Sequence, residues 1–303
     1  MIKSHSPALF LVDKPSGPTS HDMVRKIRNW TGIKRVGHGG TLDPLASGLL
    51  PIAVNNATRL VEYISEHRKT YTAQIQLGVS TDTDDAQGNI IEKAQVPEIS
   101  QMQMDSILET FRGKIQQTPP AYSAVKVNGL IAHHAARRGQ PLEIQPRSVT
   151  VHRIDIDTWK SPNLFLTLIV SSGTYVRAIA RDLGATLKCG GHIVSIRRTA
   201  IGPITIADAH SPSRIQNAFK NGNGWKLAIS PSRIIEHWPK ITLNNIQRSQ
   251  ILHGQSIDTS IHALTSTHML AFDGEGGILA ILVPEEITKG RWRPIKVLAK
   301  ERD

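Results

Sequence analysis

One short segment of the 303-residue chain has the composition of a rigid loop carrying a single acid. Residues 37–51 read GHGGTLDPLASGLLP, with four glycines and two prolines. Glycine permits backbone conformations that other residues rarely adopt, and proline fixes φ, so this composition specifies one backbone path. Asp43 precedes Pro44, which favours an extended conformation for Asp43. A carboxylate on such a loop can act as a nucleophile or a general base. The alternative is a turn residue whose side chain bonds to nearby backbone.

The glycine spacing of this loop does not fit the common nucleotide-binding patterns. The pattern G-x-x-x-x-G-K-[ST] requires Lys followed by Ser or Thr, and neither pair follows these glycines. In G-x-G-x-x-G, Gly37 and Gly39 fit, but Leu42 stands where the third glycine belongs. The loop is therefore not predicted to cradle a nucleotide.

Regular elements must hold the loop in place. The apolar run at residues 8–12 predicts a buried strand, which the polar and proline-rich residues 13–18 end. A helix is expected next, capped by Thr19 or Ser20 and ended at Gly32. Later patterns predict strands at 71–77, 164–170 and 193–196, and helices from Ser100 to Phe111 and over 176–187.

Two regions depart from this alternation of strands and helices. Residues 118–150 begin with Thr-Pro-Pro, are rich in His and Arg and have weak periodicity, which predicts a long excursion from the core. From about residue 235 onward, short strands are expected around 241–243, 269–272, 278–283 and 295–298. The sequence therefore predicts a mixed α/β (α+β) domain over residues 1–234 and a small β-rich domain over 235–303.

The charge balance indicates a polyanionic partner. The chain has 36 Lys and Arg against 25 Asp and Glu, a formal net charge of +11. General basicity without function is the alternative, but the charge is clustered. Residues 23–42 hold five basic residues and no acid, and basic residues also gather in 137–153, 177–198 and 289–302. If these segments converge in space, they can bind a folded polyanion such as an RNA.

Other features narrow the class of protein. Cys189 is the single cysteine, which excludes an internal disulfide framework and a multi-cysteine zinc site. No apolar run reaches the roughly 18 residues that a membrane helix needs, and the N-terminus lacks the apolar stretch of a signal peptide. We therefore expect a cytoplasmic protein with no membrane contact.

Several segments together resemble one enzyme family. Residues 37–51 resemble the signature of the TruB family, the bacterial tRNA pseudouridine-55 synthases, which reads approximately G-H-x-G-x-L-D-P-x-A-x-G-x-L-P. Residues 235–303 are more weakly similar to a PUA-like RNA-binding domain. Six other segments also resemble motifs of this family, and they occur in the same order as in the family. They are LVDKPSG at 11–17, KTY at 69–71, TDTDDAQG at 81–88, QTPPAYSAVK at 117–126, SGTYVR at 172–177 and GHIVSIRR at 191–198.

The resemblance implies a fold and a set of site residues. The fold is that of pseudouridine synthases, a mixed and largely antiparallel sheet flanked by helices. Residues 118–150 are an RNA-gripping segment, here called the thumb insertion. By resemblance, Asp43 is the catalytic residue. The substrate-binding residues implied are His38, Tyr71, Tyr175, Arg177, Ile196 and Lys14.

The implied reaction suits a carboxylate. Pseudouridylation breaks the C1′–N1 bond of a uridine, turns the base and joins C5 to C1′. This isomerisation needs no redox cofactor and implies no metal ion. Asp43 either attacks C1′ covalently or removes a sugar proton to give a glycal-like intermediate, and the sequence leaves both open. Either role needs an ionised carboxylate in a partly dry pocket, where Arg177 can offset the desolvation.

The target base must leave its stack in the tRNA loop before it can react. Tyr71 is the expected platform for the extruded base, and its phenol could assist proton removal from C5. His38, flanked by glycines, is expected to fill the vacated space. Tyr175 and Ile196 are expected to wall the pocket, while Lys14 supports the loop or contacts a phosphate.

We therefore expect an isomerase that acts on the T-arm of tRNA at uridine 55, as a monomer without a required protein partner. Two alternatives are a tRNA-binding or RNA-chaperone protein with little catalysis, and a pseudouridine synthase for another RNA. The chain departs from many relatives in the thumb insertion, where His133 and His134 replace an aromatic residue and an acid. This difference affects how the thumb insertion is expected to contact RNA, and it does not affect the expected chemistry.

Overall fold

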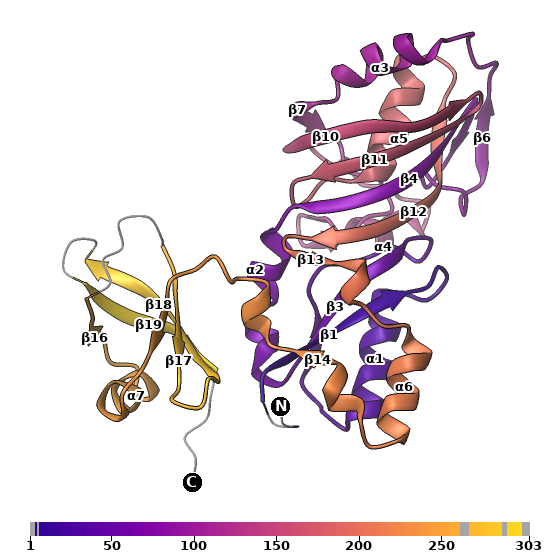
Figure 1. The fold of residues 1–303 in the computed structure, drawn as a ribbon. Helices are drawn as coiled ribbons and strands as arrows, with labels where there is room; N and C mark the ends of the chain where they lie inside the picture. The colour runs from indigo at the N-terminus through magenta and orange to yellow at the C-terminus, as the bar shows by residue number, and fades with distance from the viewer. Residues whose placement is uncertain (1–3, 5, 261–266, 287–289, 299–303) are drawn as a thin grey trace.

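The computed structural model describes residues 4, 6–260, 267–286 and 290–298. Within this part of the chain, one large mixed α/β body carries a ten-stranded sheet, and a smaller sheet follows it (Figure 1). Strand β12 runs parallel to β3, and the other pairings of the large sheet are antiparallel. The main path of the sheet is β14 (Ala228–Ile229), β1 (Ala8–Lys14), β3 (Ser47–Val54), β12 (Gly191–Ile201), β4 (Lys69–Leu77), β11 (Asn163–Val170), β10 (Arg147–Lys160) and β7 (Gly113–Gln117), with β2 (Val36–His38) beside β3 and β13 (Ile204–Thr205) beside β12.

The first strand and helix form as their local sequence predicts. In α1 (Ser20–Thr31), the Thr19 hydroxyl accepts a hydrogen bond from the Asp22 backbone N–H, and the Asp22 carboxylate accepts one from the Thr19 N–H. This reciprocal capping satisfies donors that the first turn leaves free. Gly32 ends the helix with φ +71° and donates its N–H to the Arg28 carbonyl.

The alternation of β1 separates two cores. Phe10 and Val12 point to the face that also holds Met23 and Ile27 of α1, whereas Leu9 and Leu11 point to the opposite face. Side chains of α5 (Val176–Thr186) join the first of these cores, and α5 packs on β12. The loop bearing Asp43 lies at this helix-covered face, since Leu42 and Ala46 belong to the same core.

Further short elements complete the described part of the chain. None of its helices is long and apolar enough to span a membrane. The remaining helices are α2 (Val61–Glu66), α3 (Gln101–Glu109), α4 (Ala132–Ala136), α6 (Pro212–Lys220) and α7 (Asn245–Leu252), with short 3₁₀ helices η1 (Asn55–Leu60), η2 (Ile206–Asp208), η3 (Gly224–Leu227) and η4 (Pro231–Arg233). In Figure 1, α6 lies beside α1 at the β1 end of the large sheet.

The segment 118–150 contains little regular structure, as its weak periodicity predicts. It holds a small hairpin of β8 (Lys126–Val127) and β9 (Leu130–Ile131), followed by α4. Strand β10 begins at Arg147 and pairs with β7, so the last residues of the segment lie in the large sheet. A second hairpin, β5 (Val79–Thr81) with β6 (Ile90–Lys93), flanks residues 82–89.

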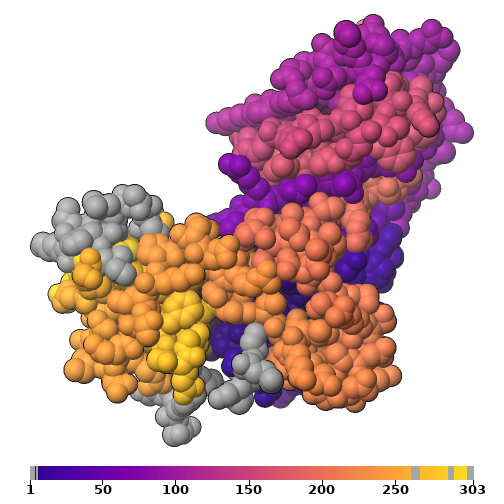
Figure 2. All heavy atoms as spheres, in the orientation of Figure 1, coloured from indigo at the N-terminus to yellow at the C-terminus, as the bar shows by residue number. Residues whose placement is uncertain are grey.

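The C-terminal strands form a separate sheet that packs against the large body. Its order is β15 (Lys240–Thr242), β17 (Met269–Phe272), β18 (Ile278–Glu286), β19 (Arg291–Val297) and β16 (Ile257–Asp258). Leu270 and Ile281 of this sheet join the core that Leu9 and Leu11 of β1 occupy. In Figure 2 the orange and yellow atoms of this region lie directly against the rest of the molecule.

Polar contacts reinforce this junction. The side chains of Asn56 and Arg59 donate to the carbonyls of Leu298 and Val297 at 2.5 and 2.6 Å. Lys296 donates to the Arg59 carbonyl at 2.7 Å, pairs with Glu62 and lies 4.8 Å from the Tyr63 ring centre. Lys296 therefore serves the junction, although the charge pattern groups it with RNA-binding residues. Lys289, Lys300 and Arg302 of that cluster lie outside the described residues.

Candidate active site

The loop bearing Asp43 is fixed by hydrogen bonds on both sides of the carboxylate. On the N-terminal side, the buried Ser20 hydroxyl donates to the Leu42 carbonyl at 2.9 Å and accepts from the Leu42 N–H at 2.8 Å. On the other side, the Gly17 N–H donates to the Pro44 carbonyl at 2.8 Å. The backbone of the loop is thus tied to α1 and to the connection between β1 and α1, while the Asp43 side chain stays 40% exposed.

Lys14 lies beneath this loop and is fully buried. Its ammonium group donates to the carbonyls of Pro15, Pro18 and Pro44 at 2.9, 2.7 and 3.3 Å. Burial lowers the pKa of Lys14 to about 8, and the nearby Asp43 charge opposes that shift. Of the two roles expected for Lys14, this position fits support of the loop, because a buried ammonium saturated by carbonyls does not reach a phosphate.

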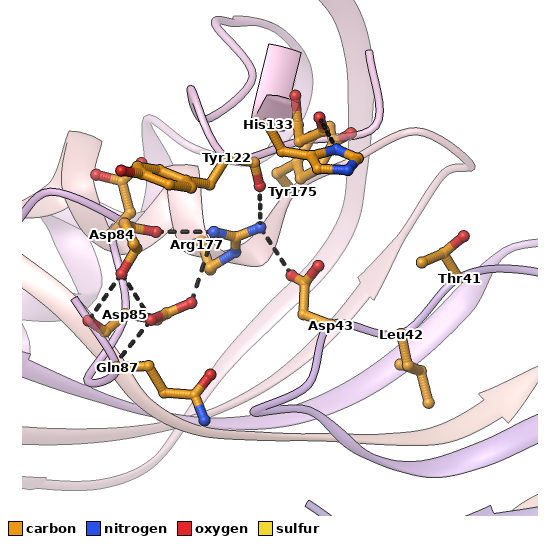
Figure 3. Close-up of polar contacts among 12 residues, drawn as sticks. Thr41, Leu42, Asp43, Asp84, Asp85, Gln87, Tyr122, His133, Tyr175 and Arg177 are labelled. Atoms are coloured by element: carbon orange, nitrogen blue, oxygen red, sulfur yellow. Dashed lines mark hydrogen bonds and ion pairs between the residues drawn. The ribbon is translucent and has the colours of Figure 1, made fainter. Parts of the chain in front are cut away.

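Arg177 is the direct partner of Asp43 (Figure 3). It stands in the first turn of α5 with a side chain only 6% exposed, and its Nη2 lies 2.9 Å from Asp43 Oδ2. The same nitrogen donates to the Tyr122 carbonyl at 2.9 Å, and Nη1 donates to the Thr83 carbonyl at 2.8 Å. Nη1 also lies 3.5 Å from Asp85 Oδ2. Fixed contacts thus orient the guanidinium toward the exposed carboxylate.

The acids around Arg177 come from the turn between β5 and β6. Asp85 is 8% exposed and accepts hydrogen bonds from the Thr83 hydroxyl at 2.7 Å and the Gln87 N–H at 3.0 Å. Asp84 pairs with Arg181 at 3.0 Å. Burial raises the pKa of the Asp84 carboxyl above its usual value, and the charges of Arg181 and Arg177 oppose that shift. The turn therefore offers a carboxylate to each of the two arginines of α5.

The base of the thumb insertion is bound to the same helix. Arg181 donates to the Thr118 carbonyl at 2.8 Å, and Arg177 donates to that of Tyr122. One residue further, the Ser123 carbonyl lies 2.9 Å from His133 Nδ1 and accepts from the His133 N–H at 3.0 Å. The His133 and His134 rings lie 4.4 Å apart. A continuous set of contacts therefore runs from α4 to Arg177.

Tyr175 immediately precedes α5, beside Arg177 in the chain. Its N–H donates to the Gln117 side-chain oxygen at 2.8 Å, and its carbonyl accepts from the Gln117 amide at 3.1 Å. The Arg147 guanidinium lies 4.9 Å from the centre of the Tyr175 ring, within range of a cation–π contact. The Tyr175 side chain is half-buried.

His38 ends β2, opposite Ile52 of β3 and five positions before Asp43. Its ring is half-buried, and Nδ1 has no hydrogen-bond partner within the described chain. Burial lowers the pKa of His38 below its usual value, and the Arg198 charge adds to that effect. Both effects favour the neutral imidazole.

Tyr71 and Ile196 lie on neighbouring strands. In the antiparallel pair of β4 and β12, Tyr71 stands opposite Arg198 and Ala73 stands opposite Ile196. Directly opposed residues share a face, and so do residues two apart, so these four side chains point to one side of the sheet. That side is the helix-covered face, since Tyr71 and Ala73 belong to its core. Tyr71 is 8% exposed and Ile196 is half-buried.

Three residues that hold the site were not identified as such from the sequence. The sequence predicts only a possible helix-capping role for Ser20, whereas its hydroxyl holds Leu42. The sequence assigns no role to Asp85, and it groups Arg198 with the basic residues expected to bind RNA. That expectation is wrong for Arg198, which is buried and donates to backbone carbonyls. The one available signal was the acid-rich run of residues 81–88, which lies far from the loop of Asp43 in the chain.

Comparison with known families agrees with this geometry. Residues 28–176 match the N-terminal domain of the TruB family of pseudouridylate synthases, and residues 177–227 match the C-terminal domain of tRNA pseudouridylate synthase B. A tRNA pseudouridine synthase B of Synechococcus sp. (strain CC9311) is 44% identical over 253 residues, which cover 82% of this chain and 84% of that protein. One of Dehalococcoides mccartyi (strain ATCC BAA-2266) is 35% identical over 286 residues and covers 94% of both chains.

Solved structures of similar fold include a chain in the crystal structure of a Cbf5-Nop10-Gar1 complex. It gives a TM-score of 0.73 at 22% identity, and the match covers 97% of this chain and 85% of that one. A chain in a structure of an H/ACA RNP bound to a substrate RNA gives a TM-score of 0.72 at 20% identity, covering 96% and 85%. At these identities the likeness concerns the fold, and it agrees with the expected pseudouridine synthase sheet with a β-rich C-terminal region. The full-length relatives and the family match establish that this chain belongs to the TruB family of tRNA pseudouridine synthases, which are isomerases.

Proposed function

We propose that this enzyme converts uridine 55 in the T-loop of tRNA to pseudouridine, with Asp43 as the catalytic carboxylate. The observation that carries the proposal is the ion pair between Arg177 Nη2 and Asp43 Oδ2 at 2.9 Å. A guanidinium at this distance orients the carboxylate through a charge-assisted hydrogen bond. Because the Asp43 side chain keeps 40% of its surface exposed, a ribose can reach it.

In the proposed reaction, Asp43 acts on the ribose of the target. It either bonds to C1′ as the C1′–N1 bond breaks, or takes a sugar proton to give a glycal-like intermediate. The freed uracil turns and C5 bonds to C1′. In the first route this step breaks the Asp43–C1′ bond and restores the carboxylate, and in the second route the sugar carbon regains its proton from Asp43. The proton on C5 is then lost to solvent while N1 gains one. Atoms balance without a co-reactant, so the enzyme is proposed to act without a cofactor.

Base extrusion is the second part of the proposal. A stacked uridine cannot reach Asp43, so the target nucleotide must leave its loop. His38 is proposed to fill the vacated space, and its neutral imidazole can stack on the neighbouring bases. Tyr71 is proposed to support the extruded base, with Tyr175 and Ile196 as walls. The placement of Tyr71 and Ile196 on one face supports this assignment.

The domain roles complete the proposal. We assign residues 1–234 to catalysis, with the thumb insertion over the T-arm, and residues 235–303 to RNA binding as a PUA-like domain. Arg293 is exposed on β19 and suits a phosphate backbone, whereas its exposed neighbour Arg291 already pairs with Glu285 at 2.9 Å. The enzyme is proposed to work as a monomer.

Tritium release tests the chemistry. Transfer RNA labelled with 5-³H-uridine is incubated with the wild type, Asp43→Asn and, as a matched control, Asp157→Asn, whose carboxylate accepts from the Thr167 hydroxyl on the neighbouring strand. We expect label release by the wild type and Asp157→Asn and none by Asp43→Asn, with tRNA affinity retained in all three. Equal release by Asp43→Asn would contradict the catalytic role. A tRNA with cytidine at position 55 should release no label from that site, and unchanged release would contradict the target position.

A further inference from the structure

Two adjacent arginines of β12 differ in their exposure to solvent. Arg197 is 39% exposed and pairs with Asp13 at 2.8 Å. Arg198 is 1% exposed and is among the largest fully buried side chains of the described chain. A buried guanidinium is costly unless its donors are satisfied, so the contacts of Arg198 indicate what its burial achieves.

All three nitrogens of Arg198 donate to backbone carbonyls on the two sides of Asp43, two in the loop and one at the start of β3. Nη2 donates to the Gly40 carbonyl at 3.0 Å, Nη1 to that of Thr41 at 3.2 Å and Nε to that of Leu49 at 2.8 Å. Two of these carbonyls precede Asp43 and the third follows it. The rigid fork of the guanidinium therefore fixes both ends of the loop relative to each other.

Close strand approach brings Arg198 to this position. β12 and β3 run parallel, with Arg198 opposite Gly48. Gly48 has φ +101°, and a Cβ there would lie 2.3 Å from the Arg198 carbonyl oxygen. Only glycine allows the two backbones to come this close, and the approach sets the guanidinium directly beside the carbonyls of the loop.

The segment that Arg198 holds joins two residues of the proposed mechanism. His38 lies directly before Gly39–Gly40, and Asp43 lies two positions after Thr41. Lys14 and Ser20 hold Pro44 and Leu42, close to the carboxylate, whereas Arg198 holds the stretch between the two side chains. Gly40 has φ +124°, a conformation with little intrinsic preference, so this stretch depends on outside contacts for its shape.

We propose that Arg198 is a positioning residue, which sets the spacing of His38 and Asp43 through the carbonyls of Gly40 and Thr41 without touching the RNA. This inference rests on the proposed roles of His38 and Asp43. Base extrusion and attack on the ribose must occur on one nucleotide, so an error in this spacing slows the reaction even when tRNA is bound normally.

The test compares Arg198→Lys and Arg198→Met with the wild type in single-turnover reactions at saturating enzyme. Misplacement of a reacting group by an ångström costs roughly 100-fold in rate, so we expect Arg198→Met to react about 100-fold more slowly. Affinity for tRNA should stay within about threefold, since the phosphate contacts remain. Arg198→Lys should recover only part of the rate, because one ammonium cannot reproduce the planar fork.

Chemical rescue separates positioning from general damage. Methylguanidinium should restore part of the rate of Arg198→Ala by occupying the vacated space, whereas methylammonium at the same concentration should not. Lys69→Met is the matched control, because Lys69 is a buried cation that donates to the carbonyls of Ser65 and His67, outside the loop. It should lower the melting temperature and leave the single-turnover rate unchanged.

Several results would overturn the proposal. One is a wild-type rate in Arg198→Met, and another is a rate loss in Arg198→Met that is matched by an equal loss of tRNA affinity. The others are a rate loss in Lys69→Met as large as that in Arg198→Met, and failure of methylguanidinium to restore more activity than methylammonium. If Arg198→Met does not fold, Arg198→Lys carries the test through its ratio of rate loss to affinity loss. The proposed function fails separately: activity in Asp43→Asn contradicts the catalytic role, whereas activity in Arg198→Met with an inactive Asp43→Asn contradicts only the positioning role.

Discussion

Arg177 Nη2 lies 2.9 Å from Asp43 Oδ2 and donates at the same time to the Tyr122 carbonyl at the base of the thumb insertion. One nitrogen therefore contacts both the exposed carboxylate and the segment expected to close over RNA. The other terminal nitrogen contacts the Thr83 carbonyl and faces Asp85. Movement of the thumb base would change the environment of Asp43, because the two share a hydrogen-bond donor.

The first prediction concerns this shared donor. Arg177→Met should reduce the single-turnover rate by at least roughly 100-fold, because Asp43 loses its cation and the buried Asp85 is left without a counter-charge. Rapid-quench kinetics on labelled tRNA measures the loss. Arg112→Met is the matched control, since Arg112 also contacts two carboxylates and a carbonyl, on α3 and β10. Similar rates for Arg177→Met and the wild type would contradict the role of the ion pair.

The second prediction separates base extrusion from chemistry at His38. His38→Ala should lower turnover by roughly 10- to 100-fold, the cost of unstacking a base without assistance. A substrate whose target uridine is already unpaired and unstacked should recover part of the loss, as measured by tritium release. His152→Ala, on the exposed side of β10, should react normally with both substrates. An unchanged deficit on the unstacked substrate would count against the extrusion role.

The third prediction follows from the buried ammonium of Lys14. Its pKa falls to about 8 in the folded protein, against about 10.4 in an unfolded chain. Above about pH 8 the neutral amine has two N–H donors for three carbonyls, so the loop of Asp43 loosens and the rate should fall with a midpoint near 8. Rate profiles from about pH 6 to 10 test this. Lys14→Met should lack the inflection, and an inflection that persists there would refute the assignment.

The lowered pKa of Lys14 also makes the stability of the fold depend on pH, and stability changes in the opposite direction to the rate. Between about pH 8 and 10.4 the unfolded chain keeps a proton that the folded chain has lost, so the unfolded state binds more protons. The contribution of Lys14 to the free energy of unfolding therefore becomes more favourable as pH rises through this window. Urea titrations of the wild type against Lys14→Met isolate it. A stability difference that does not change in this direction would contradict the lowered pKa.

The fourth prediction uses two glycines with positive φ. Gly48→Ala should lower the free energy of unfolding by roughly 3–5 kcal/mol, because a Cβ collides with the Arg198 backbone in addition to the strained φ. Gly32→Ala should lower it by only about 1–2 kcal/mol, since a Cβ there meets no atom within 4 Å. Urea unfolding curves give both values. Equal losses of unfolding free energy in the two variants would show that the close approach of β3 and β12 adds nothing to the cost at Gly48.

The fifth prediction concerns the charge of +11. Affinity for tRNA should fall at least about 100-fold between roughly 50 and 200 mM salt, as expected when several phosphates are neutralised. Arg137 and Arg138 are exposed at the end of α4, and replacing both with Gln should reduce the salt slope by about two. Filter binding over a salt series measures the slope. A slope unaffected by the double change would place the RNA away from α4.

The sequence alone determined features that depend on neighbours in the chain. The ends of α1 follow from Thr19, Asp22 and Gly32, because a helix cap forms between residues three or four positions apart. The alternation in β4 likewise fixed which side chains of that strand are buried. The composition of residues 37–51 indicated a constrained loop with one carboxylate, since glycine and proline act on their own backbone. Residues 39–46 form that loop, whereas the two ends of the segment lie in β2 and β3.

Only the tertiary structure decided which side chains hold that loop. Arg198 reaches Leu49 across 149 positions of the chain, and this contact exists because β12 runs beside β3 in the large sheet. The same holds for Lys14. Lysine side chains are usually exposed to solvent, yet the fold buries this one among three carbonyls. Sequence spacing carries no record of strand order, so the partner of a buried charge is set by which strands and loops come together in space.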